Sequence, residues 1–189
     1  MRTLSRMNKA DIIAQSWVEL FQTERSAERH PEVEADRLGD VPPAIPMRLV
    51  SAHATNALAK LEGLAKERGF DVASAGKAGK GVGEMFSQVR EKVADLVLTN
   101  QVSYRGTLLG IRHGIDLMKL VHQAAEDDEE LRAWATEWLD ERTYLATSVE
   151  KELAWFGDNP DVALAPVVDS TLARVAKKLT GRSEPAPKM

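Results

Sequence analysis

Histidines and carboxylates supply the side chains in this chain that could ligate a metal ion. His113 and Asp116 are three residues apart, a spacing that places both on one side of a helix, and His122 follows on the same segment. His53 offers a further ligand from a separate helical segment. Imidazole and carboxylate groups together suit transition metals, so the pattern gives one candidate function, a metal-binding helical bundle.

The ferritin-like metal proteins provide a test of that candidate, because they place a Glu-x-x-His motif on each of two helices. The positions three residues before the four histidines hold Ala27, Val50, Gly110 and Lys119, so the motif is absent. The competing interpretation is that these histidines are core residues hydrogen-bonded to a neighbouring helix. We favour that interpretation, which requires no cofactor and leaves a transition metal ion as the alternative.

Arg142 lies between Trp138 and Leu145 in the apolar stripe of its predicted helix. A guanidinium in that position must reach water or pair with a carboxylate, because an unpaired buried charge is costly. We expect Asp116 to be the partner, with Arg112 drawn into the same network. The favoured interpretation is a buried ion pair that fixes helix register, and the alternative is a ligand pocket inside the bundle.

No other motif indicates a reaction. The chain has no cysteine, which excludes a thiol nucleophile and a zinc–thiolate site, and it has no Gly-x-Ser-x-Gly. The glycine-rich segment 76–83 lacks the spacing of a phosphate-binding loop, and the acidic run 126–130 lacks the spacing of a calcium loop. These absences favour a non-catalytic protein.

Tryptophans suggest a contact surface. Trp155 lies off the apolar stripe of its helix, and Trp17 lies on a first helix that the sequence separates from the rest. Leu172 belongs to a short apolar stripe over residues 168–179. Exposed aromatic and apolar groups of this kind are typical of interaction sites, so Trp17, Trp155 and Leu172 are the candidate contacts with a protein partner or a second copy.

The elements that position these residues are helices. Apolar residues recur at helical spacing over residues 11–29, 47–68, 82–99, 103–125, 129–156 and 168–179. The segment 103–125 is apolar nearly all round, which predicts the centre of a bundle. Whether residues 82–125 form one helix or two stays open. Asp127 or Asp128 is the expected N-cap of the helix that follows, and Gly69 the expected C-cap of 47–68.

The fold that these elements predict is all-α, a four-helix bundle that is ferritin-like in architecture only. Residues 1–46 are expected to form an extra N-terminal amphipathic helix followed by a proline-rich linker over 30–46. Residues 47–157 are expected to form the bundle from segments 47–68, 82–99, 103–125 and 129–156. Residues 158–189 are expected to form a short helix and a disordered tail.

Composition sets the remaining limits. The 189 residues suffice for one core, 43% are hydrophobic, and the formal net charge of −4 gives no basic field for nucleic acid or anionic membrane. No apolar run approaches the length of a membrane span, and the N-terminus does not resemble a signal peptide. We therefore expect a cytoplasmic, non-catalytic interaction or assembly protein that forms a homo-oligomer.

Overall fold

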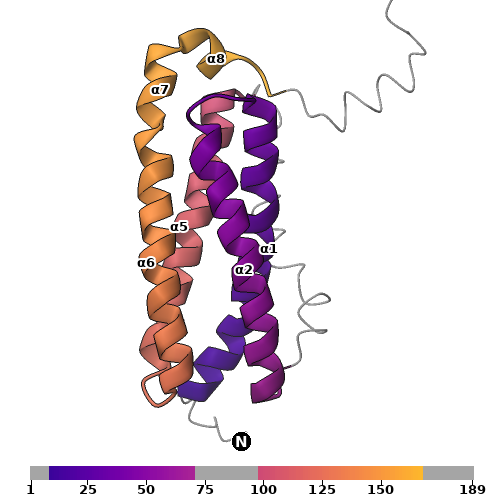
Figure 1. Ribbon diagram of the computed structural model, residues 1–189, viewed down its shortest axis with the longest axis vertical. Helices are drawn as coiled ribbons and strands as arrows, with labels where there is room; N and C mark the ends of the chain where they lie inside the picture. Colours follow the sequence, from indigo (N-terminus) through magenta and orange to yellow (C-terminus); the bar gives the residue numbers. More distant parts are fainter. Residues whose placement is uncertain (1–8, 71–97, 168–189) are drawn as a thin grey trace, which may run out of the picture.

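Four long helices form the bundle. The computed structural model describes residues 9–70 and 98–167, and within these ranges every regular element is a helix. The long helices are α1 (Lys9–Leu38), α2 (Ala44–Arg68), α5 (Asn100–Ala124) and α6 (Glu129–Lys151). The short helices α7 (Leu153–Asp158) and α8 (Pro160–Leu164) lie together at one end (Figure 1). The all-α bundle predicted from the sequence is confirmed.

The helices pack in the circular order α1, α2, α6, α5, and the connections fix their directions. α1 and α2 are antiparallel neighbours, as are α5 and α6 (Figure 1). The guanidinium of Arg68, at the end of α2, contacts Asp128 beyond the end of α5, so α2 and α5 run in the same direction. Phe70 and Leu98, the described residues on either side of the gap, therefore lie at opposite ends of the bundle.

α1 is a member of the bundle, which corrects the expectation that the first helix lies outside it. It packs most extensively against α2 and then against α5. Its stripe of Trp17, Leu20 and Phe21 is buried in the same core as the other three long helices. A helix with a continuous apolar stripe must bury that stripe, and the space between α2 and α5 accepts it.

The expected linker over 30–46 is also wrong, because most of it is helical. α1 continues through Pro31 to Leu38, and α2 begins at Ala44. Pro43 is the N-cap of α2 and Pro46 lies in its first turn, where a missing backbone N–H removes no intrahelical hydrogen bond. Only five residues separate the two helices, and Gly39 turns the chain there with a φ of 78°.

Helix ends follow the sequence signals closely. The Asp128 carboxylate accepts a hydrogen bond from the backbone N–H of Leu131 at 3.0 Å, which confirms the N-cap of α6. Gly69 ends α2 in the left-handed conformation at φ 69°, as expected of a C-cap glycine. Thr99 has an extended backbone, so no continuous helix runs across it into α5. The single helix expected over 129–156 is interrupted at Glu152, between α6 and α7.

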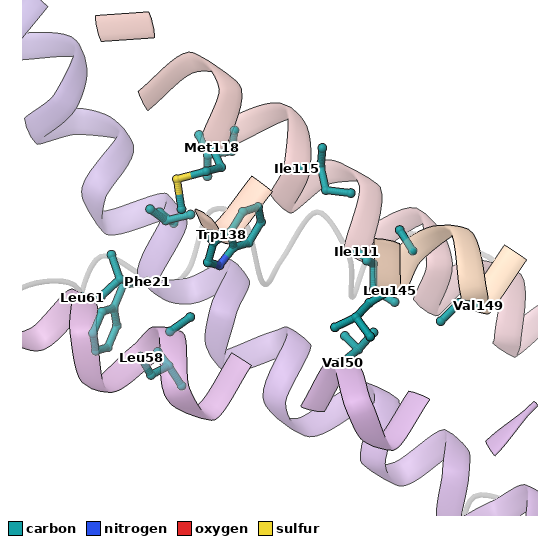
Figure 2. Packing of buried hydrophobic residues seen from close by; sticks show 14 of the residues in the cluster. Phe21, Val50, Leu58, Leu61, Ile111, Ile115, Met118, Trp138, Leu145 and Val149 are labelled. Carbon is teal, nitrogen blue, oxygen red and sulfur yellow. The ribbon is translucent and has the colours of Figure 1, made fainter. Parts of the chain in front are cut away.

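The core lies along the axis of the bundle, between all four long helices. Figure 2 shows Trp138 from α6 in the middle of this core, with Met118 of α5 and Phe21 of α1 beside it. The core extends toward α7 and α8 through Tyr104, whose hydroxyl donates to the carbonyl of Val149 at 3.1 Å. The residues expected to be core from helical spacing on α2, α5 and α6 are largely buried here.

Three expected segments lie outside the described residues: the glycine-rich loop, most of the helix expected over 82–99, and the C-terminal helix with its tail. Within the described ranges, no helix has the length and hydropathy needed to cross a bilayer.

Candidate functional site

Arg142 is fully buried, with 0% of its side chain exposed. Its Nη2 donates to Glu24 Oε2 at 2.6 Å, and Glu24 on α1 is likewise fully buried. The guanidinium also lies over the Trp138 ring, 4.7 Å from its centroid. The ion pair and the cation–π contact join α6 to α1 at the centre of the bundle.

His53 of α2 completes this polar centre. Its Nδ1 accepts a hydrogen bond from Arg142 Nε at 2.9 Å, so the ring proton of the neutral histidine is on Nε2. That nitrogen lies 3.5 Å from Oε2 of Glu141, an exposed residue. We name Glu24, His53, Trp138 and Arg142 the polar centre. It joins three of the four long helices through side chains alone.

Several polar atoms of this centre have no hydrogen-bond partner. Arg142 Nη1, Glu24 Oε1 and Trp138 Nε1 are buried without one. The indole N–H of Trp138 lies near Glu24 and acts to lower the pKa of the Glu24 carboxyl, which favours the charged carboxylate. Even so, neither Trp138 Nε1 nor Glu24 Oε1 completes a hydrogen bond. A buried ion pair with unsatisfied atoms recovers little of the cost of removing its charges from water.

The pKa directions agree with that conclusion. Burial raises the pKa of the Glu24 carboxyl, and attraction to Arg142 opposes the rise. Burial lowers the pKa of the Arg142 guanidinium, and Glu24 opposes that change. In both groups desolvation outweighs attraction, so we expect the pair to contribute little net stability, and the interpretation that it fixes helix register stays a prediction.

The buried ion pair predicted at Arg142 is present, but its partner was predicted wrongly. Asp116 is exposed and pairs with Lys119 at 3.4 Å. Arg112 is also exposed and binds Glu150 at 2.8 Å, where α5 meets α6. The outer face of α5, which carries both residues, points away from the core, so neither can reach Arg142.

Sequence reasoning missed Glu24, although a signal for it was present. Glu24 follows Leu20 by four residues and Phe21 by three, so it lies on the apolar stripe of α1. Arg142 occupies the equivalent position on the stripe of α6. Two opposite charges that each interrupt an apolar stripe are natural partners, because each would otherwise be buried without compensation.

The four candidate metal ligands are not brought together. His53 belongs to the polar centre, and His113 Nε2 lies 3.2 Å from Glu19 Oε1. His122 is half-buried in the last turn of α5, and Asp116 is exposed. Among residues 9–70 and 98–167, no group of three or more histidine or acidic side chains could hold a metal ion.

Of the two predicted contact tryptophans, Trp17 is buried and Trp155 is half-buried. Trp17 is 2% exposed and packs against Phe70 with ring centroids 5.2 Å apart. Trp155 is half-buried and meets Phe156 edge-on at 5.4 Å. Trp17 is buried because α1 belongs to the bundle, so it cannot be a surface contact. Trp155 keeps part of its surface exposed, and its role as a contact stays a prediction. Leu172 lies outside the described residues.

Exposed apolar side chains gather instead on α5. Val102, Leu109 and Leu120 are 38%, 62% and 46% exposed, respectively. They are separated by seven and eleven residues, which are two and three helical turns, so they form one row on the outer face. Ile45 and Leu49 on α2 and Tyr144 on α6 are also exposed. The row on α5 was not predicted as a surface, because the segment is apolar nearly all round.

A pocket of about 300 Å³ lies at the end of the bundle where α1 begins. Ile13 and Phe70 are among its apolar lining residues, and Lys9 and Arg68 also line it. Lys9 pairs with Glu126, and Arg68 binds Asp128 through two nitrogens, each at 2.8 Å. Both cations are thus already neutralised, so this pocket offers no free cation to an anionic ligand.

No protein-family model, curated protein or solved structure matches this chain. The function must therefore be inferred from the arrangement of its own side chains. The described residues contain a buried polar centre and an exposed apolar row on α5.

Titration of His53 gives the polar centre a pH signature. Burial, and secondarily the Arg142 charge, lowers the pKa of His53 to about 4. The pKa of this histidine in the unfolded chain is about 6.5. At pH values between about 4 and 6.5, His53 therefore binds a proton in the unfolded chain but not in the folded one. The free energy of unfolding falls as the pH falls through this range. We expect a loss of about 2 kcal/mol between pH 7 and pH 5.

Urea unfolding followed by circular dichroism at several pH values measures this dependence. The His53→Asn variant is the control, because an amide oxygen can still accept from Arg142 but does not titrate in this range. We expect most of the difference in unfolding free energy between pH 7 and pH 5 to be absent from this variant. Equal pH dependence in both proteins would contradict the assignment to His53.

Proposed function

We propose that this chain is a non-catalytic interaction module that self-associates through the outer face of its bundle. The observation that carries the proposal is the row of Val102, Leu109 and Leu120, which places three large, exposed apolar side chains on one side of the same helix. Single exposed apolar residues are common on monomers, whereas an aligned row marks a contact surface.

The interior of the bundle supports a scaffold role. The buried polar groups at its centre bind one another rather than face a cleft: Arg142 is held by Glu24 and His53 and covered by Trp138. Such a centre orients helices, and a rigid bundle presents its outer faces in a fixed arrangement. The metal-binding alternative gains no support from any side-chain cluster in the described residues.

Sedimentation velocity of the full chain over a wide concentration range tests the proposal. We expect a dimer or larger assembly that dissociates on dilution, with a sedimentation coefficient that rises with concentration. A chain that stays monomeric up to several hundred micromolar would contradict self-association. Measurement at low and high salt adds information, because an apolar contact persists in salt that screens ionic contacts.

A further inference from the structure

His53 connects the buried polar centre to the surface of the bundle. Its side chain on α2 is 8% exposed, and each ring nitrogen lies next to a charged residue of α6. Nδ1 accepts from Nε of Arg142 at 2.9 Å, and Nε2 lies 3.5 Å from Oε2 of Glu141, which is exposed. This one ring therefore forms a polar link between α2 and α6 that extends from the core to solvent.

A charged His53 is incompatible with this geometry. An imidazolium carries a proton on both nitrogens, so its Nδ1 accepts no hydrogen bond. Nε of Arg142 is also a donor, and arginine keeps its charge. Protonation would thus place two N–H groups and two positive charges against each other in a buried site, which is costly. A ring that keeps its new proton must move away from Arg142.

Glu141 is the acceptor toward which the charged ring can move. The described helices that pack mainly against α2 are α1 and α6. They bring three charged groups to this ring, namely Glu24, Arg142 and Glu141. Glu24 Oε2 is already held by Arg142 at 2.6 Å, and the Glu28 carboxylate of α1 binds a threonine hydroxyl of α2 at 3.1 Å. Glu141 offers an acceptor beside water, where a charged ring is better solvated.

We infer that His53 is an acid-sensitive latch between α2 and α6. On protonation the ring releases Nε of Arg142 and donates through Nε2 to Glu141, so the polar centre loses its contact with α2. The ion pair between Arg142 and Glu24 does not involve the ring, so α1 and α6 stay joined. The latch acts within one chain and is independent of self-association.

The electrostatics of the site set the pH at which the latch opens. Burial, and secondarily the charge of Arg142, lowers the pKa of His53 to about 4. Above this pH the folded chain holds a neutral ring, which can accept from Arg142, and the latch is closed. We expect it to open as the pH falls through about 4.

Nitrogen-15 NMR of the full chain reports the protonation of each ring nitrogen. At pH 7 we expect His53 to be neutral with its proton on Nε2, and below about pH 4 to be protonated on both nitrogens. The helical circular dichroism should persist through this titration. Loss of the helical signal before the ring titrates, or together with it, would overturn the latch, because protonation would then unfold the bundle.

The Glu141→Gln variant tests the exchange of partners. It removes the negative charge that stabilises the protonated ring, so the pKa of His53 should fall by about half a pH unit. The matched control is Asp140→Asn, which removes an exposed carboxylate that points about 100° away around α6. We expect the control to leave the pKa of His53 nearly unchanged. Equal shifts in the two variants, or no shift in Glu141→Gln, would overturn the role of Glu141.

Hydrogen exchange measures whether α2 is released. Between pH 7 and about pH 3.5, the protection factors of α2 amides near His53 should fall about tenfold further than those of α1 amides near Glu24. The His53→Asn variant should show no such difference, because its amide oxygen accepts from Arg142 at both pH values. An equal loss of protection in the two helices of the original chain would overturn the latch.

Discussion

Replacing Glu24 by alanine should destabilise the bundle by about 3–5 kcal/mol, a large part of the roughly 5–15 kcal/mol that holds a typical domain together. The variant leaves the Arg142 guanidinium fully buried, with His53 as its one remaining hydrogen-bond partner. Arginine does not lose its proton, so the charge persists. Urea unfolding followed by far-ultraviolet circular dichroism measures the loss.

The converse variant should be milder. Arg142→Met leaves the Glu24 carboxyl without its cation, but a carboxyl whose pKa is already raised by burial can bind a proton and become neutral. We therefore expect a smaller loss than in Glu24→Ala. Glu19→Ala on the same helix serves as the control, because its partner His113 is partly exposed, and it should cost less than about 1 kcal/mol.

The double variant Glu24→Leu/Arg142→Met distinguishes the energetic contributions. Since desolvation outweighs attraction for both members of the pair, an apolar pair of similar volume should be neutral or stabilising by about 1–4 kcal/mol. A double variant as unstable as Glu24→Ala would mean that the ion pair itself supplies much of the stability. It would then be wrong to regard the pair as a device that fixes helix register.

The second large effect is expected at Gly114, where α5 packs tightly against Thr23 of α1. A Cβ at this position would lie 3.1 Å from Thr23 Cγ2, 3.8 Å from Trp138 Cη2 and 3.9 Å from Glu24 Oε1. A leucine would therefore push α1 away and disturb the polar centre. We expect Gly114→Leu to lower the unfolding free energy by about 3 kcal/mol, at the upper end of the usual cost of overpacking.

Gly106 offers a control on the same helix. A Cβ there would meet no atom within 4 Å, so Gly106→Ala should gain helix propensity without a steric cost, stabilising the chain by up to about 1 kcal/mol. The two glycine variants should thus change the urea midpoint in opposite directions. A stable Gly114→Leu variant would show that α1 can move outward at little cost, and that its packing at this point is loose.

Among the described residues, the sequence by itself determined most of the helical segments and where several of them end. Helical spacing of apolar residues, the Asp128 N-cap and the Gly69 C-cap depend on neighbouring residues only, and the structure agrees with each. The position of Arg142 in the apolar stripe of α6 also required a buried partner before any partner was known. These features are local because a helix satisfies its backbone hydrogen bonds within itself.

The proline-rich segment shows where local interpretation failed. Four prolines over residues 31–46 indicated a linker, yet one lies within α1 and two lie at the start of α2. A proline at the start of a helix loses no hydrogen bond, so its presence is compatible with a helix as much as with a loop. Packing of α1 against α2 then favoured two long helices joined by a short turn.

Only the tertiary structure decided which helices are neighbours and therefore which side chains meet. An apolar stripe indicates that one side of a helix is buried, but it does not indicate which element covers that side. The structure supplied α1 as a member of the bundle, Glu24 as the partner of Arg142 from 118 residues away, and the burial of Trp17. It also distinguished the inner from the outer side of α5, since a helix apolar nearly all round gives no local sign of which leucines face solvent.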